Sequence, residues 1–234
     1  MHSETLIAIE TSCRTGGIVL AQGHEILESV TFDASSRHTV ELISRLSGAM
    51  ASAGIAPSEL DQVCVSAGPG SFTGLRIGMS VVKTMCQLLP RLRCVAVPSA
   101  EVIAENMRRV DWQHLGVLLS AKREQVYAVL FTRRAGQVHV DWPGTVMSAN
   151  EFLRSAPKPL LLTGEALEHV EVSGPGIDVA EPSLHLPTAE GLWQVGKRLA
   201  ADGRFTDPRQ LAPIYGRRPE AVRLWEQRGK ASGG

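Results

Sequence analysis

Short apolar runs separated by polar turns organise the first half of the chain. Three runs follow one another closely, each bounded by Gly, Ser or charged residues, which is the pattern of consecutive strands. Apolar residues then recur at spacings of three and four up to Gly54, which is typical of a helix with a glycine stop signal. The order of elements is βββαβα, with strands predicted over Leu6–Glu10, Gly17–Ala21, Glu25–Thr31 and Gln62–Ser66, and helices over His38–Ala53 and Thr73–Leu89.

The second half repeats this order of elements, although no sequence identity is visible between the two copies. A strand over Arg93–Pro98 and a helix over Ser99–Arg109 are predicted to connect the halves. The second set is predicted as strands over Gly116–Ser120, Gln125–Thr132, Gln137–Trp142 and Leu160–Thr163, and helices over Ala149–Ser155 and Ala189–Ala201.

A duplicated βββαβα order indicates an α/β protein with two lobes that face one another across a cleft. This is the arrangement of the actin, Hsp70 and sugar-kinase group, in which each half is ribonuclease H-like. We expect an N-terminal lobe over residues 1–98, a C-terminal lobe over residues 99–215, and a polar tail over residues 216–234 that frays. The segment Val172–Pro187, rich in Pro and Gly, is expected to be a connecting loop.

Charge and cysteine content narrow the classes of function. The 24 basic and 24 acidic side chains balance, so no overall field attracts nucleic acid or an anionic membrane, and any RNA contact is expected to be local or to come through a partner. The four cysteines show no Cys-x-x-Cys spacing, which is typical of buried thiols in a reducing compartment. Since no window resembles a signal peptide or a membrane span, we expect a cytoplasmic protein without a membrane partner.

The first candidate site is the polar end of the first strand. Glu10, Thr11 and Ser12 follow the apolar run, and the chain then turns back at Gly16-Gly17. In actin-like proteins a turn of this kind holds nucleotide phosphates, because backbone N–H groups and hydroxyls donate to phosphate oxygens while an acid orients a metal or water. An ordinary hairpin with a hydrophilic tip is the alternative, and the residues alone do not decide between the two.

The second candidate site is the glycine-rich segment Ser66–Gly78, which links a strand to a helix. Unpaired amides at a helix start bind anions, but Leu75-Arg76 stands where a P-loop requires Lys followed by Ser or Thr, so a P-loop is excluded. Gly74 and Gly78 lie one turn apart on one helix face, with Ser71 near its start. This small-residue face predicts either a groove for a helix of another molecule or close packing inside the lobe.

Together these segments resemble the TsaB (YeaZ) family in order and spacing. The resemblance is strong over roughly the first hundred residues and patchy beyond. Glu10 departs from the family, which more often has Asp there. The matching segments are Ile7–Ser12, Arg37-His38-Thr39, Gly68–Gly78, Ala121–Ala128 and Pro213–Val222.

The resemblance implies a non-catalytic subunit of tRNA threonylcarbamoyladenosine synthesis. In that family the chain pairs with the related catalytic subunit TsaD, the small ATPase TsaE joins them, and tRNA is met through the complex. The resemblance then implies no catalytic or metal-binding residue, and it makes Glu10, Thr11 and Ser12 a vestigial phosphate turn. Two possibilities stay open: weak binding of ATP or ADP at the partner interface, and a homodimer of the lone chain. The partner-binding residues implied on the first-lobe helices are Arg37, His38, Ser71, Phe72, Thr73, Gly74, Arg76 and Gly78.

The alternative function is that of an enzyme, either an ATP-dependent phosphotransferase or a glycoprotease-type hydrolase. It would need Glu10 beside a bound nucleotide and a second carboxylate from the other lobe. The second-lobe turn offers Lys122, Arg123 and Glu124 where an actin-like enzyme commonly has an Asp-Gly pair, which favours the non-catalytic reading. The catalytic relative carries His-x-x-x-His, whereas no two of the seven histidines here are three to five residues apart, and His-Glu-x-x-His is absent too.

Overall fold

The first lobe is a mixed five-stranded sheet with helices on both faces. The computed structural model describes residues 3–33, 38–121 and 125–216. The strand order is β3-β2-β1-β4-β5, with β1 antiparallel to β2 and parallel to β4. Its elements are β1 (Thr5–Glu10), β2 (Thr15–Gln22), β3 (Glu25–Asp33), α1 (His38–Ala53), η1 (Pro57–Glu59), β4 (Gln62–Gly68), α2 (Phe72–Leu88) and β5 (Arg93–Pro98).

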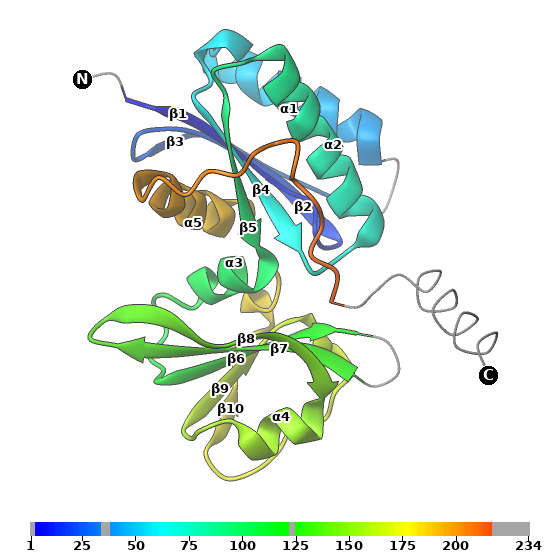
Figure 1. Cartoon of the computed structure of the whole chain (residues 1–234), viewed down its shortest axis with the longest axis vertical. Helices are drawn as coiled ribbons and strands as arrows, with labels where there is room; N and C mark the ends of the chain where they lie inside the picture. Colours follow the sequence, from blue (N-terminus) through cyan, green and yellow to red (C-terminus); the bar gives the residue numbers. More distant parts are fainter. Residues whose placement is uncertain (1–2, 34–37, 122–124, 217–234) are drawn as a thin grey trace, which may run out of the picture.

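The second lobe repeats the strand order of the first. Its sheet runs β10-β9-β6-β7-β8, which in reverse is the order of the first sheet, and β6 is antiparallel to β7 and parallel to β9. The predicted duplication is therefore confirmed, and the chain has the two-lobed actin-like α/β fold (Figure 1). The elements are α3 (Ser99–Asn106), β6 (His114–Ser120), β7 (Gln125–Arg134), β8 (Gln137–Ser148), α4 (Ala149–Ser155), β9 (Leu160–Thr163), η2 (Glu165–Glu168), β10 (Ile177–Val179), η3 (Pro182–Leu184) and α5 (Ala189–Ala201).

The position of the last helix in the repeat differs from the sequence prediction. The segment expected to be a plain loop contains the strand β10, which the sequence pattern did not predict because it has only three residues. The short helix η2 therefore occupies the place of α2 in the second copy, and α5, which follows the fifth strand, is the counterpart of α3.

The two lobes exchange these counterpart helices. Leu192, Trp193 and Val195 of α5 pack in one core cluster with strand residues of the first sheet, including Leu6 and Ala8. Conversely, α3 contributes Ala100, Ile103 and Ala104 to the core of the second lobe, although its Val102 belongs to the cluster that α5 forms with the first sheet. Thr206 also pairs with Cys94, so the chain returns to the first lobe after residue 188 (Figure 1). A division at residue 98 thus describes the sheets but not the packing of residues 189–215.

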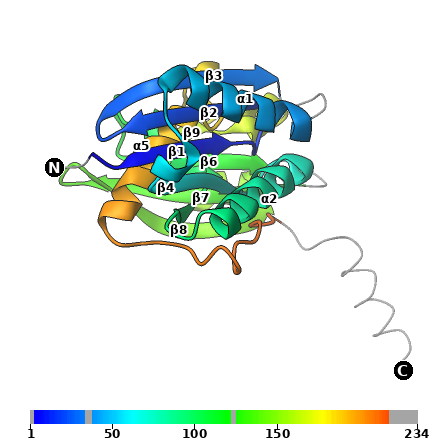
Figure 2. The same ribbon diagram turned by 90° about the horizontal axis from the view of Figure 1, so that it is seen from above.

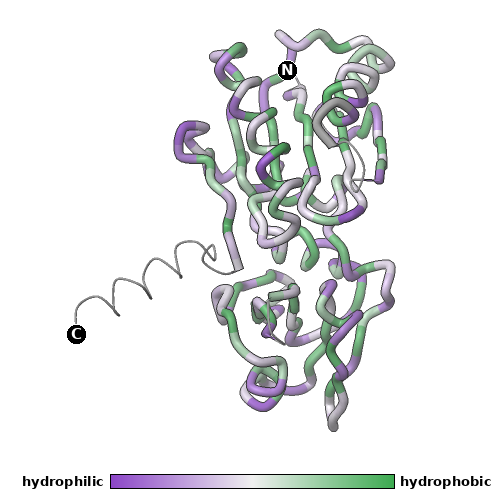
Figure 3. The backbone as a smooth tube through the Cα atoms, turned by 90° about the vertical axis from the view of Figure 1, so that its right-hand side faces the viewer, coloured by the Kyte–Doolittle hydropathy of each residue, from purple (hydrophilic) through white to green (hydrophobic). Residues whose placement is uncertain are grey.

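Alternation along β1 explains why the first sheet is covered on both faces. Leu6 and Ala8 face α5, whereas Ile7 and Ile9 belong to the core cluster that α1 and α2 cover. Figure 1 and Figure 2 show α1 and α2 next to each other on one side of the first sheet, and Figure 1 shows α5 on the other side. In Figure 3 hydrophobic positions gather along the strands and hydrophilic ones at many of the turns. One outer face of the first lobe is thus formed by two neighbouring helices.

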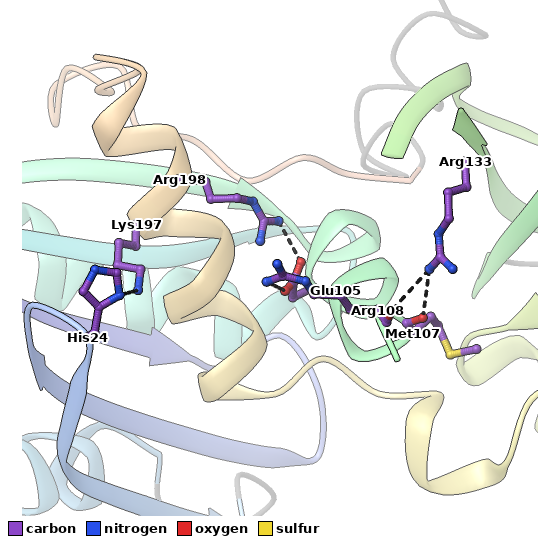
Figure 4. Close-up of polar contacts among 7 residues, drawn as sticks. All are labelled: His24, Glu105, Met107, Arg108, Arg133, Lys197 and Arg198. Carbon is purple, nitrogen blue, oxygen red and sulfur yellow. Dashed lines mark hydrogen bonds and ion pairs between the residues drawn. The ribbon is translucent and has the colours of Figure 1, made fainter. Parts of the chain in front are cut away.

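Polar contacts join the exchanged helices to each other and to both lobes. The carboxylate of Glu105 on α3 accepts from Arg198 of α5 at 2.7 Å and from Arg108 at 3.5 Å (Figure 4). Arg133 of β7 donates to the backbone oxygens of Met107 and Arg108 at 3.3 and 3.4 Å, just beyond the end of α3. These contacts link α5 to α3 and α3 to the second sheet, so they oppose separation of the lobes.

No helix among the described residues is both long enough and apolar enough to span a membrane. Residues 217–234, which include all but the first residue of the expected tail, lie outside the described part of the chain.

Candidate functional site

The side chain of Glu10 fills the turn that was predicted to bind phosphate. Glu10 is the last residue of β1 and is fully buried. Its carboxylate accepts a hydrogen bond from the backbone N–H of Ser12 at 2.6 Å and another from the hydroxyl of Ser66 on β4. A backbone N–H that would donate to a phosphate oxygen in a nucleotide-binding turn therefore donates to Glu10 instead.

Burial also sets the charge of Glu10. Removal from water disfavours the ionised form and raises the pKa of this carboxyl, although contacts with Ser12 and Ser66 oppose the shift. The Ser12 hydroxyl lies close enough to favour the ionised form, but it is not oriented for a hydrogen bond with any described residue. Glu10 is therefore a structural acid that holds the turn together.

The glycine-rich segment packs against this same turn. The backbone N–H of Ser71 donates to the carbonyl oxygen of Ser12 at 2.7 Å, and the Ser71 hydroxyl caps α2 by accepting from the Gly74 N–H at 3.2 Å. A Cβ atom at Gly74 would overlap the carbonyl oxygen of Thr11, and one at Gly78 would overlap the Thr11 hydroxyl. The glycine face therefore serves internal packing, and the groove that we considered for a second molecule is filled by residues 11 and 12.

The remaining predicted residues of α2 lie on its outer side. Phe72, Thr73 and Arg76 are exposed. The Arg76 guanidinium lies 3.9 Å from the centre of the Phe72 ring, whose centre is 5.5 Å from that of Tyr215. Arg76 also donates to the Tyr215 hydroxyl at 3.5 Å. This stacked cluster is a preformed aromatic and cationic feature at the start of α2.

The structure does not describe the side chains of the two partner-binding residues that were predicted before and at the start of α1. Arg37 lies outside the described residues, as do Lys122, Arg123 and Glu124 of the second-lobe turn. His38 is the first residue of α1, and its side chain is not described.

The outer surface of α1 and α2 combines small side chains with a few large apolar ones. Ile43, Phe72 and Leu88 are 49%, 48% and 75% exposed, although each is a residue that normally prefers the interior. Small exposed residues lie between them on the same helices. Because their side chains are short, the backbone of another helix can approach this surface closely. We call this surface the α1/α2 face; its small exposed members are Ser44, Ser47, Gly48, Ala51, Thr73, Ser80 and Thr84.

A small cavity marks the place where the two lobes meet. Its walls include Ser12 and Pro69 of the first lobe, Ser99 at the start of α3, and Leu119 and Glu165 of the second lobe. Its volume is about 10 Å³, whereas a pocket for a drug-sized ligand or cofactor has several hundred. This cavity is therefore too small to hold a nucleotide.

Glu165 is the site residue that sequence reasoning missed. It begins η2 directly after β9, and burial raises the pKa of its carboxyl. Polar residues at the end of a buried apolar strand were the signal available, since Thr163-Gly164-Glu165 follows Leu160–Leu162 just as Glu10-Thr11 ends β1. The alternative enzyme function requires a second carboxylate from the other lobe, but Glu165 lines a cavity that Glu10 does not line and that has no room for a nucleotide.

The Cys13 thiol lines the same cavity. Burial, together with the neighbouring charge of Glu10, raises the pKa of the Cys13 thiol to about 12, so this thiol stays protonated at neutral pH. No group of three or more His, Cys, Asp or Glu residues in the described part of the chain is arranged to hold a metal ion.

Replacing Glu10 by glutamine is expected to change how stability depends on pH. Because the folded-state pKa of Glu10 is raised above its unfolded value, its contribution to stability is fully present below about pH 4.5 and is lost as the pH rises through the folded pKa. Glutamine retains the acceptor for Ser12 and offers a donor to Ser66 without a charge. Urea unfolding of both proteins between pH 4 and 8 measures this.

The expected result is that Glu10→Gln equals or falls below the wild type at pH 4 and exceeds it at pH 8. A stability difference that does not vary with pH would show that Glu10 does not titrate in this range. Glu151→Gln, at an exposed position of α4, is the matched control and should leave the pH dependence unchanged.

Fold and site together define a class of protein: a two-lobed actin-like chain in which Glu10 fills the polar turn after β1 and the outer sides of the first-lobe helices are exposed. The family model described as TsaD, tRNA N6-adenosine threonylcarbamoyltransferase, matches residues 30–201. The chain therefore belongs to the TsaD family, and within it to the TsaB (YeaZ) branch.

Individual relatives agree with this assignment. The tRNA threonylcarbamoyladenosine biosynthesis protein TsaB of Bacillus subtilis is 29% identical over 94% of this chain and 97% of its own length. An uncharacterised protein of Mycobacterium tuberculosis is 30% identical, with 94% of this chain and 95% of that protein covered. The structure of YeaZ from Pseudomonas aeruginosa superposes with a TM-score of 0.74 at 22% identity, covering 91% of this chain and 99% of that chain, which supports the fold.

Proposed function

We propose that this chain acts in tRNA threonylcarbamoyladenosine biosynthesis as a non-catalytic subunit that binds TsaD through the α1/α2 face. The observation that carries the proposal is the exposure of Ile43, Phe72 and Leu88 on two neighbouring helices whose other exposed residues are mostly small. Membership of the family supports a role in this pathway, and the exposed apolar residues of the face support binding to a partner.

The shape of the α1/α2 face suits helix-on-helix packing. Serine, glycine and alanine side chains let a partner helix come close, and the larger side chains at the ends can fill pockets on the partner. The face carries little charge, as the centres of protein interfaces usually do, and Arg76 with its stacked Phe72 ring is a suitable anchor at one end.

The absence of catalysis by the lone chain is part of the proposal. Glu10 is bound to Ser12 and Ser66, and the cavity between the lobes is smaller than a nucleotide, so no acid is presented to a substrate there. Any weak ATP or ADP binding would then require the surface shared with TsaD. We further propose that the complex acts in the cytoplasm with TsaE, that it meets tRNA as a complex, and that the lone chain can use the same face to form a homodimer.

The test is reconstitution with the TsaD and TsaE of the same organism. Size-exclusion chromatography with light scattering should give a stable one-to-one complex with TsaD, and threonylcarbamoyl transfer to tRNA should require both proteins. Failure to form this complex, or ATP hydrolysis by the lone chain at the rate of the full mixture, would contradict the proposal and favour an actin-like ATP-dependent enzyme. A chain without ATPase activity that cleaves peptides would favour the hydrolase reading.

A further inference from the structure

The cavity between the lobes contains buried hydroxyl groups that need a partner. Ser99, the first residue of α3, is 1% exposed, and Ser12, two residues beyond β1, is 2% exposed. Both residues line the cavity, and neither hydroxyl is oriented for a hydrogen bond with a described residue, although the Glu10 carboxyl lies near that of Ser12. An unsatisfied buried hydroxyl lowers stability by about 1–3 kcal/mol, so two of them at one place call for an explanation.

The cavity has the size and the lining of a water site. A single water needs at least about 10–15 Å³ of space and two to four polar partners, and this cavity has a volume of about 10 Å³. Its third polar wall is Glu165, whose carboxylate accepts only a long hydrogen bond, 3.4 Å, from the Ser120 N–H among its described contacts. The two hydroxyls and this carboxylate come from different parts of the fold: the first lobe, the connecting helix α3 and the second lobe.

We propose that one ordered water molecule occupies this cavity and bridges Ser12, Ser99 and Glu165, so that it clasps the two lobes in their closed arrangement. The water donates to Glu165 and exchanges hydrogen bonds with the two hydroxyls, which satisfies all three groups at once. Pro69, Leu119 and Pro187 contribute apolar walls, so the polar partners of the water are on the side of the two serines and Glu165. This role goes beyond the proposed function and does not depend on binding to TsaD.

A bridging water and an empty cavity predict opposite effects on the melting temperature when a hydroxyl is removed. If Ser99 bonds to a water, Ser99→Ala removes a hydrogen bond and should lower the melting temperature by about 2–4 °C. If the cavity is dry, the same change removes an unsatisfied group, and alanine also favours the helix, so the melting temperature should rise or stay. Thr11→Val is the matched control, because the Thr11 hydroxyl is also buried and without a partner but does not line the cavity.

A crystal structure of the full chain at about 1.5 Å resolution provides the second measurement and does not depend on how the variants fold. The expected result is one spherical density peak within about 3.2 Å of the Ser12 hydroxyl, the Ser99 hydroxyl and a Glu165 oxygen. An empty cavity, a peak bonded to one lobe only, or density for a larger molecule would overturn the proposal. So would a melting temperature of Ser99→Ala that equals or exceeds that of the wild type.

Discussion

Replacing Ser47 on α1 or Ser80 on α2 by arginine is expected to weaken binding to TsaD by about 100-fold or more. Both serines are exposed on the α1/α2 face and lie among its small residues. A long charged side chain there prevents close approach of a partner helix and buries a charge without a counterion, which is strongly unfavourable. Light scattering and calorimetric titration against TsaD measure the loss, and threonylcarbamoyl transfer should fall in parallel.

The matched control is Ser155→Arg, an exposed serine at the end of α4 in the second lobe. Its affinity for TsaD should remain within about threefold of the wild type, since it lies on a helix outside the face. All three variants should melt within about 2 °C of the wild type, because substitutions at exposed positions have small effects on stability. Normal affinity of Ser47→Arg and Ser80→Arg, with Ser155→Arg impaired, would move the interface to the second lobe.

Gly74→Ala is expected to reduce the free energy of unfolding by about 3 kcal/mol. The added Cβ would overlap the carbonyl oxygen of Thr11, a backbone atom that cannot move without disturbing the turn that Glu10 holds. The first lobe should therefore unfold at lower urea concentration, and TsaD binding per folded molecule should be little changed. Urea titration followed by circular dichroism measures the difference.

The matched control for this prediction is Gly48→Ala on α1. A Cβ at Gly48 meets no atom within 4 Å, so alanine should stabilise the helix by about 1 kcal/mol through its higher propensity. The two glycines thus give opposite signs for the same chemical change. If Gly74→Ala were as stable as the wild type but could not bind TsaD, the glycine face would contact the partner rather than the turn at residues 11 and 12.

The exchange of helices gives the lobe arrangement a physical basis. Because α5 packs on the first sheet and α3 on the second, opening the lobes would have to disrupt the contact between Glu105 and Arg198 and expose apolar side chains such as Leu192. These contacts therefore favour a fixed arrangement of the two lobes.

Local patterns in the sequence were sufficient for the strands, the helices and their duplicated order. The short apolar run of β1 with its polar end at Glu10 and the three-four spacing of apolar residues along α1 are visible in the sequence itself, so these elements and their duplicated order could be predicted. Most element boundaries were close, but β8 extends to Ser148, well beyond the predicted end at Trp142, and the three-residue strand β10 was missed because so short a run carries no periodic signal.

Tertiary structure alone decided which sheet each exchanged helix covers and what the glycines contact. An amphipathic helix such as α5 shows that it has one apolar face but not which sheet will bury it, because either lobe offers a suitable surface. In the same way, Gly74 indicates that another atom packs closely against the helix, but the sequence does not show which one. In the structure it is the carbonyl oxygen of Thr11. Ser12, Ser99 and Glu165, distant in sequence, meet at one cavity only because the two lobes close on each other.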